Sequence, residues 1–117
     1  VRPFLRNLFS DPAIIRLPWP LRPLLAEVIS RKRNKKARKI YQQMGGSSPL
    51  LSNTKAQRFS LCQLLREKLP GKKVEVFIAM RYWHPFTKEA VMKVKEFRPD
   101  KVVLLPLYPQ FSTTTTG

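Results

Sequence analysis

Two short apolar runs, Val74–Ala79 and Val102–Pro106, dominate the hydrophobic pattern of the C-terminal part of the chain. Between them lies an amphipathic helical pattern that opens at Pro85 and places its apolar residues on one face. These residues are Ala90, Val91, Val94 and Phe97. Short apolar runs on either side of a helix are typical of a βαβ unit in a parallel sheet that is buried on both faces. The pattern therefore predicts an α/β fold in which helices flank a parallel sheet.

Each apolar run is followed at once by a polar and aromatic loop. The loops read MRYWHP and LYPQFSTTTTG, and their ligand-facing side chains include Arg81, Tyr82, His84, Tyr108, Gln110 and Ser112. Ligands of parallel α/β sheets bind beyond the carboxyl ends of the strands. An arginine just past a buried strand is costly unless it meets an anion or a hydrogen-bonded network. These loops suit a flat, apolar ligand with anionic arms, although a solvated loop and helix cap explain the threonine run equally well.

Three further helical patterns precede the first apolar run. The first lies within VRPFLRNLF and stops at Ser10-Asp11-Pro12. The second carries an apolar stripe at helical spacing, which we interpret as core packing. The stripe consists of Leu21, Leu24, Leu25, Val28 and Ile29. The third begins at a capping box of Thr54 and Gln57, and its stripe consists of Phe59, Cys62, Leu65 and Leu69.

A large excess of positive charge narrows the classes of partner. The chain has 23 Lys and Arg against 7 Asp and Glu, a formal net charge of +16. Such an excess predicts attraction to nucleic acid, to an acidic membrane surface or to a small polyanionic ligand. Residues 31–39, RKRNKKARK, hold much of it. Helical spacing continues through this stretch to Tyr41 and ends at Gly45-Gly46, so the segment belongs to the fold and is not a free basic tail.

This basic helix, with Arg33, Tyr41 and Ser48, is a second candidate binding site. Arginine forks match carboxylates, and tyrosine or serine hydroxyls add hydrogen bonds. The loop GGSSP also offers backbone N–H groups for a carboxylate or phosphate oxygen. From the residues alone, phosphate binding is the better reading. A small basic nucleic-acid-binding protein of ribosomal type is therefore an alternative function, and it predicts binding that weakens steeply with salt.

The sequence contains no complete set of metal ligands. His84 is the only histidine, so no histidine cluster or dyad of histidines can form. We expect it to cap or pack rather than to catalyse, and we place the nearest carboxylate, Glu89, on the outer part of a helix. The single cysteine, Cys62, is expected in the core and is compatible with a reducing compartment. No apolar run is long enough to span a membrane, and no signal peptide is visible.

Several separated blocks of the chain resemble ferrochelatase, the enzyme that inserts ferrous iron into a porphyrin. They are VRPFLRNLFSDPAIIRLP, RKRNKKARKIY, GGSSPL, AMRYWHPF and LLPLYPQFSTTTTG. The resemblance implies a Rossmann-like (chelatase-like) sheet that is incomplete here, because residues 1–117 would form most of the first of two such domains. The first strand and the second domain would be missing. By motif position, Arg33, Tyr41 and Ser48 would contact the porphyrin propionates, and Arg81 and Tyr82 would line the cleft.

The resemblance also implies partners and a location. The substrates would be ferrous iron and protoporphyrin IX or coproporphyrin III, with no cofactor, resident metal or nucleic acid bound by this chain. The residues that accept the pyrrole protons would lie in the second domain, so the fragment alone is expected to be inactive. An apolar membrane lip would contact the inner face of a bacterial membrane from the cytoplasm. The lip comprises Ile14, Ile15, Leu17, Trp19, Leu21 and Leu24.

Overall fold

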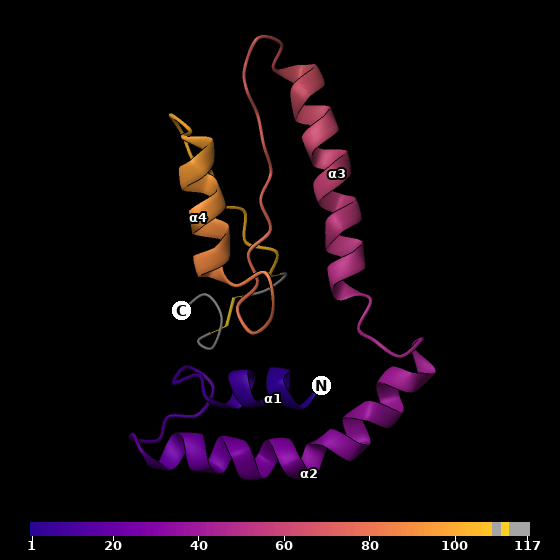
Figure 1. The fold of residues 1–117 in the computed structure, drawn as a ribbon, viewed down its shortest axis with the longest axis vertical. Helices are drawn as coiled ribbons and strands as arrows, with labels where there is room; N and C mark the ends of the chain where they lie inside the picture. Colours follow the sequence, from indigo (N-terminus) through magenta and orange to yellow (C-terminus); the bar gives the residue numbers. More distant parts are fainter. Residues whose placement is uncertain (109–110, 113–117) are drawn as a thin grey trace. The chain divides into compact units, whose positions relative to one another are not determined.

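Four helices form the regular structure of the described part of the chain, residues 1–108 and 111–112 of this computed structural model. They are α1 (Arg2–Phe9), α2 (Leu21–Gln43), α3 (Leu50–Lys68) and α4 (Thr87–Phe97) (Figure 1). The chain divides into two compact units. One unit joins Val1–Ile40 to the segment that begins at Asp100, and the other is Tyr41–Pro99.

In the first unit, α1 packs beside α2 through one face of α2 (Figure 1). Ala26 and Ser30 on this face are fully buried. Their small side chains allow close approach, and the Ser30 hydroxyl donates to the Glu27 carbonyl oxygen at 2.9 Å, which satisfies a buried polar group. One turn further on, the Arg33 guanidinium lies 5.5 Å from the centre of the Phe9 ring. The side chains by which α2 contacts α1 are therefore small or charged, and the Phe9 ring of α1 meets one of the charges.

The apolar stripe of α2 is exposed, so its predicted role in a core is wrong for this structure. Leu21, Leu24, Leu25 and Val28 are all exposed, and Leu24 retains 66% of its accessible surface. At about 100° per residue, the stripe lies across the helix from Ala26 and Ser30, the face that α1 covers. Helix periodicity thus located the apolar stripe, but the face that packs carries the smaller side chains of Ala26 and Ser30.

In the second unit, α3 packs against the segment that follows it. Its inward residues are Arg58, Leu61, Cys62 and Leu65. Cys62 is buried, as predicted, whereas Phe59 is exposed and does not belong to the packed face. The helix begins at Leu50 with Pro49 as its N-cap. The predicted capping box at Thr54 is therefore wrong, and the Thr54 hydroxyl instead donates to the Leu50 carbonyl oxygen within the helix at 2.8 Å.

Helix α4 follows its predicted pattern closely. Ala90 is buried, and the Phe97 ring meets the Phe77 ring edge to face at 5.8 Å. Val91, which was also predicted inward, is exposed. The helix ends at Arg98 in the left-handed conformation (φ 52°), a C-terminal cap more often made by glycine.

The two apolar runs that were predicted as strands form no strand within the described residues. The one bridge recorded there is a parallel contact between Met80 and Phe86. A strand needs hydrogen bonds from neighbouring strands; in Val74–Ala79, α3 arginines bind two of the carbonyl oxygens instead. The run Val102–Pro106 is exposed, with Leu104 at 87%, so its predicted burial on both faces is wrong here. The parallel sheet is not confirmed by this structure.

Candidate functional site

The loop between Met80 and Phe86 presents two of the predicted site residues together. The Met80 N–H donates to the Pro85 carbonyl oxygen at 2.7 Å and closes the loop. Within this loop, the Arg81 guanidinium lies 5.5 Å from the centre of the Tyr82 ring, a cation–π contact. Arg81 is exposed and Tyr82 is half-buried. The loop thus offers a charged fork backed by an aromatic ring.

His84 in the same loop forms a pair with Glu89. Its Nδ1 atom lies 2.6 Å from Glu89 Oε1. The His84 ring also meets the Trp83 and Phe86 rings edge to face, at 5.5 and 4.5 Å. The packing role predicted for His84 agrees with these contacts. Glu89 was predicted on the outer part of a helix. Its side chain is 42% exposed, and from the first turn of α4 its carboxylate reaches back to the loop.

The predicted propionate contacts lie on α2 and in the loop after it. Arg33 is exposed, and Tyr41 is half-buried in the last turn of α2. The Ser48 hydroxyl oxygen accepts a hydrogen bond from the Leu50 N–H at 3.3 Å, at the start of α3. Arg33 belongs to the first unit, and the other four predicted residues belong to the second. Their convergence on one porphyrin stays a prediction.

The loop between α2 and α3 depends on glycine. Gly45 and Gly46 have φ values of +86° and +89°, in the region that disfavours other residues. The Gly46 N–H donates to the Tyr41 carbonyl oxygen at 2.7 Å, which ends α2. Ser47, which follows them, does not adopt a positive φ. The serine is thus accommodated without left-handed strain.

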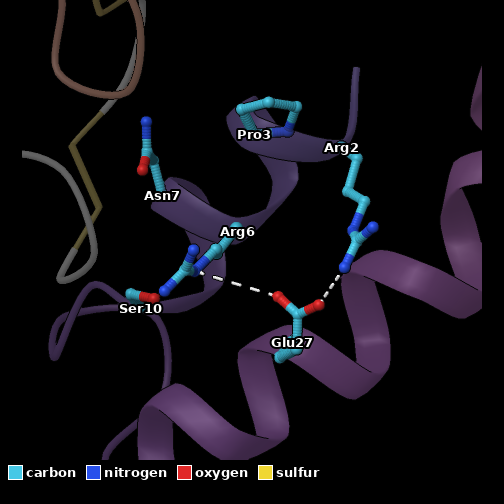
Figure 2. Close-up of a pocket in the computed structure, with 6 residues that line it drawn as sticks. All are labelled: Arg2, Pro3, Arg6, Asn7, Ser10 and Glu27. Carbon is cyan, nitrogen blue, oxygen red and sulfur yellow. Dashed lines mark hydrogen bonds and ion pairs between the residues drawn. The ribbon is translucent and has the colours of Figure 1, made fainter.

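One cluster that the sequence did not predict centres on Glu27 of α2. Its carboxylate forms ion pairs with Arg2, with Arg6 at 3.8 Å and with Arg31 at 2.8 Å. Figure 2 shows Arg2 and Arg6 reaching from α1 to Glu27. These residues line a pocket of about 640 Å³. The hydrogen bond from Arg2, followed by that from Arg31, lowers the pKa of Glu27 below its usual range. The i, i+4 spacing of Glu27 and Arg31 is the sequence feature from which this ion pair could have been predicted.

A second unpredicted cluster centres on Glu75, inside the first apolar run. Its Oε1 atom accepts hydrogen bonds from Arg58 and from the Val76 N–H, and its Oε2 atom accepts one from Arg66 at 3.0 Å. Desolvation raises the pKa of Glu75, but the Val76 N–H and Arg58 outweigh it, so the pKa lies below its usual range. Glu75 is a carboxylate within an apolar run, and because a buried charge is usually paired, this position could have predicted an ion pair.

The remaining predicted features are an exposed lip and parts of the last loop. Within the described residues, Leu17, Trp19, Leu21 and Leu24 of the membrane lip are exposed, whereas Ile14 and Ile15 are half-buried. Tyr108 is exposed. Gln110 and the four threonines lie outside the described residues.

The described residues contain no group of three or more His, Cys, Asp and Glu side chains that could hold a metal ion. The described helices also include none with the length and apolar character needed to cross a bilayer.

Comparison with known proteins gives one consistent result. The family profile described as Ferrochelatase matches residues 1–117. The ferrochelatase of Hyphomonas neptunium is 59% identical over 119 residues, which cover 100% of this chain and 33% of that protein. The ferrochelatases of Wolbachia sp. subsp. Drosophila simulans and Caulobacter vibrioides are 58% and 57% identical, over 99% and 100% of this chain and 36% and 34% of theirs. The chain thus spans about a third of these relatives. It belongs to the ferrochelatase family.

Proposed function

We propose that the protein acts in haem biosynthesis by inserting ferrous iron into a porphyrin, and that this chain supplies one wall of the porphyrin cleft. The family match over the whole chain, at 57–59% identity to three ferrochelatases, carries this proposal. In the reaction, two pyrrole N–H protons leave as iron binds the four nitrogens. Groups outside this chain accept those protons.

The chain's own contribution is to bind and orient the porphyrin. Two propionates at one edge of the macrocycle match the forks of Arg33 and Arg81. The hydroxyls of Tyr41 and Ser48 add neutral hydrogen bonds, and the Tyr82 ring provides an aromatic wall beside Arg81. The net charge of +16 favours the approach of such a dianion.

The proposal includes the chelatase-like sheet. The runs Val74–Ala79 and Val102–Pro106 keep the composition of buried parallel strands. Strands elsewhere in a protein of the relatives' length would supply their hydrogen-bond partners and cover the exposed apolar side chains of the second run. The Arg81–Tyr82 loop then follows a strand end, where α/β sheets bind ligands.

Metal insertion by the complete protein tests the proposal. The protein as its gene encodes it is mixed anaerobically with ferrous iron and either protoporphyrin IX or coproporphyrin III, and the loss of free-base porphyrin absorbance is followed. We expect catalytic turnover with one of them, and porphyrin binding that persists when salt rises from 50 to 200 mM, a range over which nucleic-acid binding falls steeply (roughly 10³-fold or more). Absence of turnover with both porphyrins would contradict the assignment.

We further propose that the membrane lip rests on the inner face of a bacterial membrane, so that the enzyme is cytoplasmic and peripheral. Trp19 and Leu24 expose 79% and 66% of their surfaces, Arg16 precedes them and Arg22 lies between them in the sequence. Because burying one large apolar side chain is worth about 1.5–3 kcal/mol, Trp19→Ser with Leu24→Ser should lower binding to acidic phospholipid vesicles at least tenfold in a sedimentation assay.

The matched control changes two exposed apolar residues outside the lip, Phe59→Ser and Met92→Ser. This variant should sediment with vesicles as the unaltered protein does. An equal loss of vesicle binding in both variants would show that the lip has no special role in membrane contact.

A further inference from the structure

The loop that carries Arg81 and Tyr82 is tied at its base by two side chains. Its backbone ends meet where the Met80 N–H donates to the Pro85 carbonyl oxygen at 2.7 Å. Beyond that closure, the two oxygens of Glu89 bind different partners. Oε2 accepts from the Phe86 N–H at 2.9 Å, at the start of α4, and Oε1 lies 2.6 Å from His84 Nδ1. One carboxylate thus joins the loop to the helix that follows it.

The surroundings of Glu89 favour this arrangement. Its carboxylate lies in the first turn of α4, where the helix dipole stabilises negative charge. The His84 ring is held on two sides, by edge-to-face contacts with Trp83 and Phe86. Because the carboxylate occupies Nδ1 and the two aromatic rings restrict rotation, the C-terminal side of the loop tip has little freedom. His84 is two residues from Tyr82, so its anchoring restricts Arg81 and Tyr82 as well.

We propose that the His84–Glu89 clasp positions Arg81 and Tyr82 for the anionic porphyrin, and that His84 is a positioning residue for substrate binding. The inference rests on the proposed function and adds to it a role for His84 and Glu89. An ordered loop binds more tightly because its conformational entropy is lost before binding. Without the clasp, that ordering occurs during binding, and the affinity for porphyrin falls.

Two substitutions of His84 separate positioning from other roles. His84→Phe keeps an aromatic ring against Trp83 and Phe86 but removes Nδ1. His84→Asn loses the ring but places an amide N–H near the position of Nδ1, so it can still donate to Glu89. The His84 side chain is 59% exposed, so neither change leaves a buried cavity. Thermal unfolding of both variants checks that the fold is kept.

The experiment uses the complete protein and three readouts: turnover, porphyrin binding and amide hydrogen exchange of residues 80–86 without porphyrin. We expect His84→Phe to raise KM and Kd for porphyrin about tenfold, with a smaller change in kcat, and to speed exchange at residues 80–86. His84→Asn should stay within about threefold of the unaltered protein in all three readouts.

Three results would overturn the clasp. A fall in kcat at constant KM, unrescued by His84→Asn, would make His84 a proton acceptor or metal ligand. Unchanged exchange and affinity in His84→Phe would show that the loop is ordered without it. Failure of the unaltered protein to bind porphyrin would remove the proposed function as well, whereas the first two results leave that function intact.

Discussion

Arg81→Leu is expected to weaken porphyrin binding by roughly 10- to 100-fold. Hydrogen bonds to charged groups contribute about 1.5–3 kcal/mol each, and each 1.4 kcal/mol is about a factor of ten in affinity. Arg81 is exposed in the loop with its guanidinium against Tyr82, so its replacement removes the positive charge and the guanidinium fork together. Titration of porphyrin absorbance with the complete protein measures the effect.

Two controls give this result its meaning. Arg81→Lys keeps the charge but not the bidentate geometry, so its affinity for porphyrin should lie between those of Arg81→Leu and the unaltered protein. Lys93→Leu removes the same charge from the exposed side of α4 and should change binding by less than about twofold, since distant exposed charges are screened. Equal weakening by Arg81→Leu and Lys93→Leu would show that only net charge matters.

Glu75→Leu is expected to destabilise the protein by about 2 kcal/mol, because it leaves two arginines without their shared carboxylate. Arg58 and Arg66 keep much of their exposure, which holds the loss below that of a fully buried pair. Denaturant unfolding measures it. Glu67→Leu on the exposed side of α3 is the control and should change the unfolding free energy by less than about 0.5 kcal/mol. Equal losses at Glu75 and Glu67 would contradict the role of the cluster.

The Glu75 cluster also predicts a direction for acid sensitivity. The pKa of Glu75 is lower in the folded chain than its ordinary 4.5. The folded state therefore gains stability from this group above that pH and loses the gain as the pH falls through the folded pKa. The difference in unfolding free energy between the unaltered protein and Glu75→Gln should be largest near neutral pH and shrink in acid. A difference that grows in acid would contradict the assignment.

The helices were predictable because their hydrogen bonds are local. The segments α1, α2 and α4 follow from spacing and from stop signals such as Gly45-Gly46. The sheet was predicted from two apolar runs, but local pattern does not show whether another strand pairs with them. In the described residues Val74–Ala79 meets arginines of α3 instead. The packed face of α2 was predicted wrongly because burial depends on which other segment packs against the helix. Here α1 covers Ala26 and Ser30.

The candidate site was predicted only in part, because only contacts between residues near in sequence can be inferred from local pattern. Arg81 and Tyr82 are adjacent in sequence, and the Arg81 guanidinium lies against the Tyr82 ring; their place in a porphyrin cleft stays a prediction. The pair of His84 and Glu89 was missed, although a glutamate at the third position of a helix is a capping signal. Convergence of Arg33 with the other residues depends on contacts over long distances in the chain, which spacing and local pattern do not determine.

A crystal structure of the complete protein with bound porphyrin tests the central claim most directly. The account predicts one porphyrin with Arg33, Tyr41, Ser48 and Arg81 within hydrogen-bonding distance of its propionates and the Tyr82 ring against the macrocycle. A porphyrin bound elsewhere, with these five side chains facing separate surfaces, would contradict it.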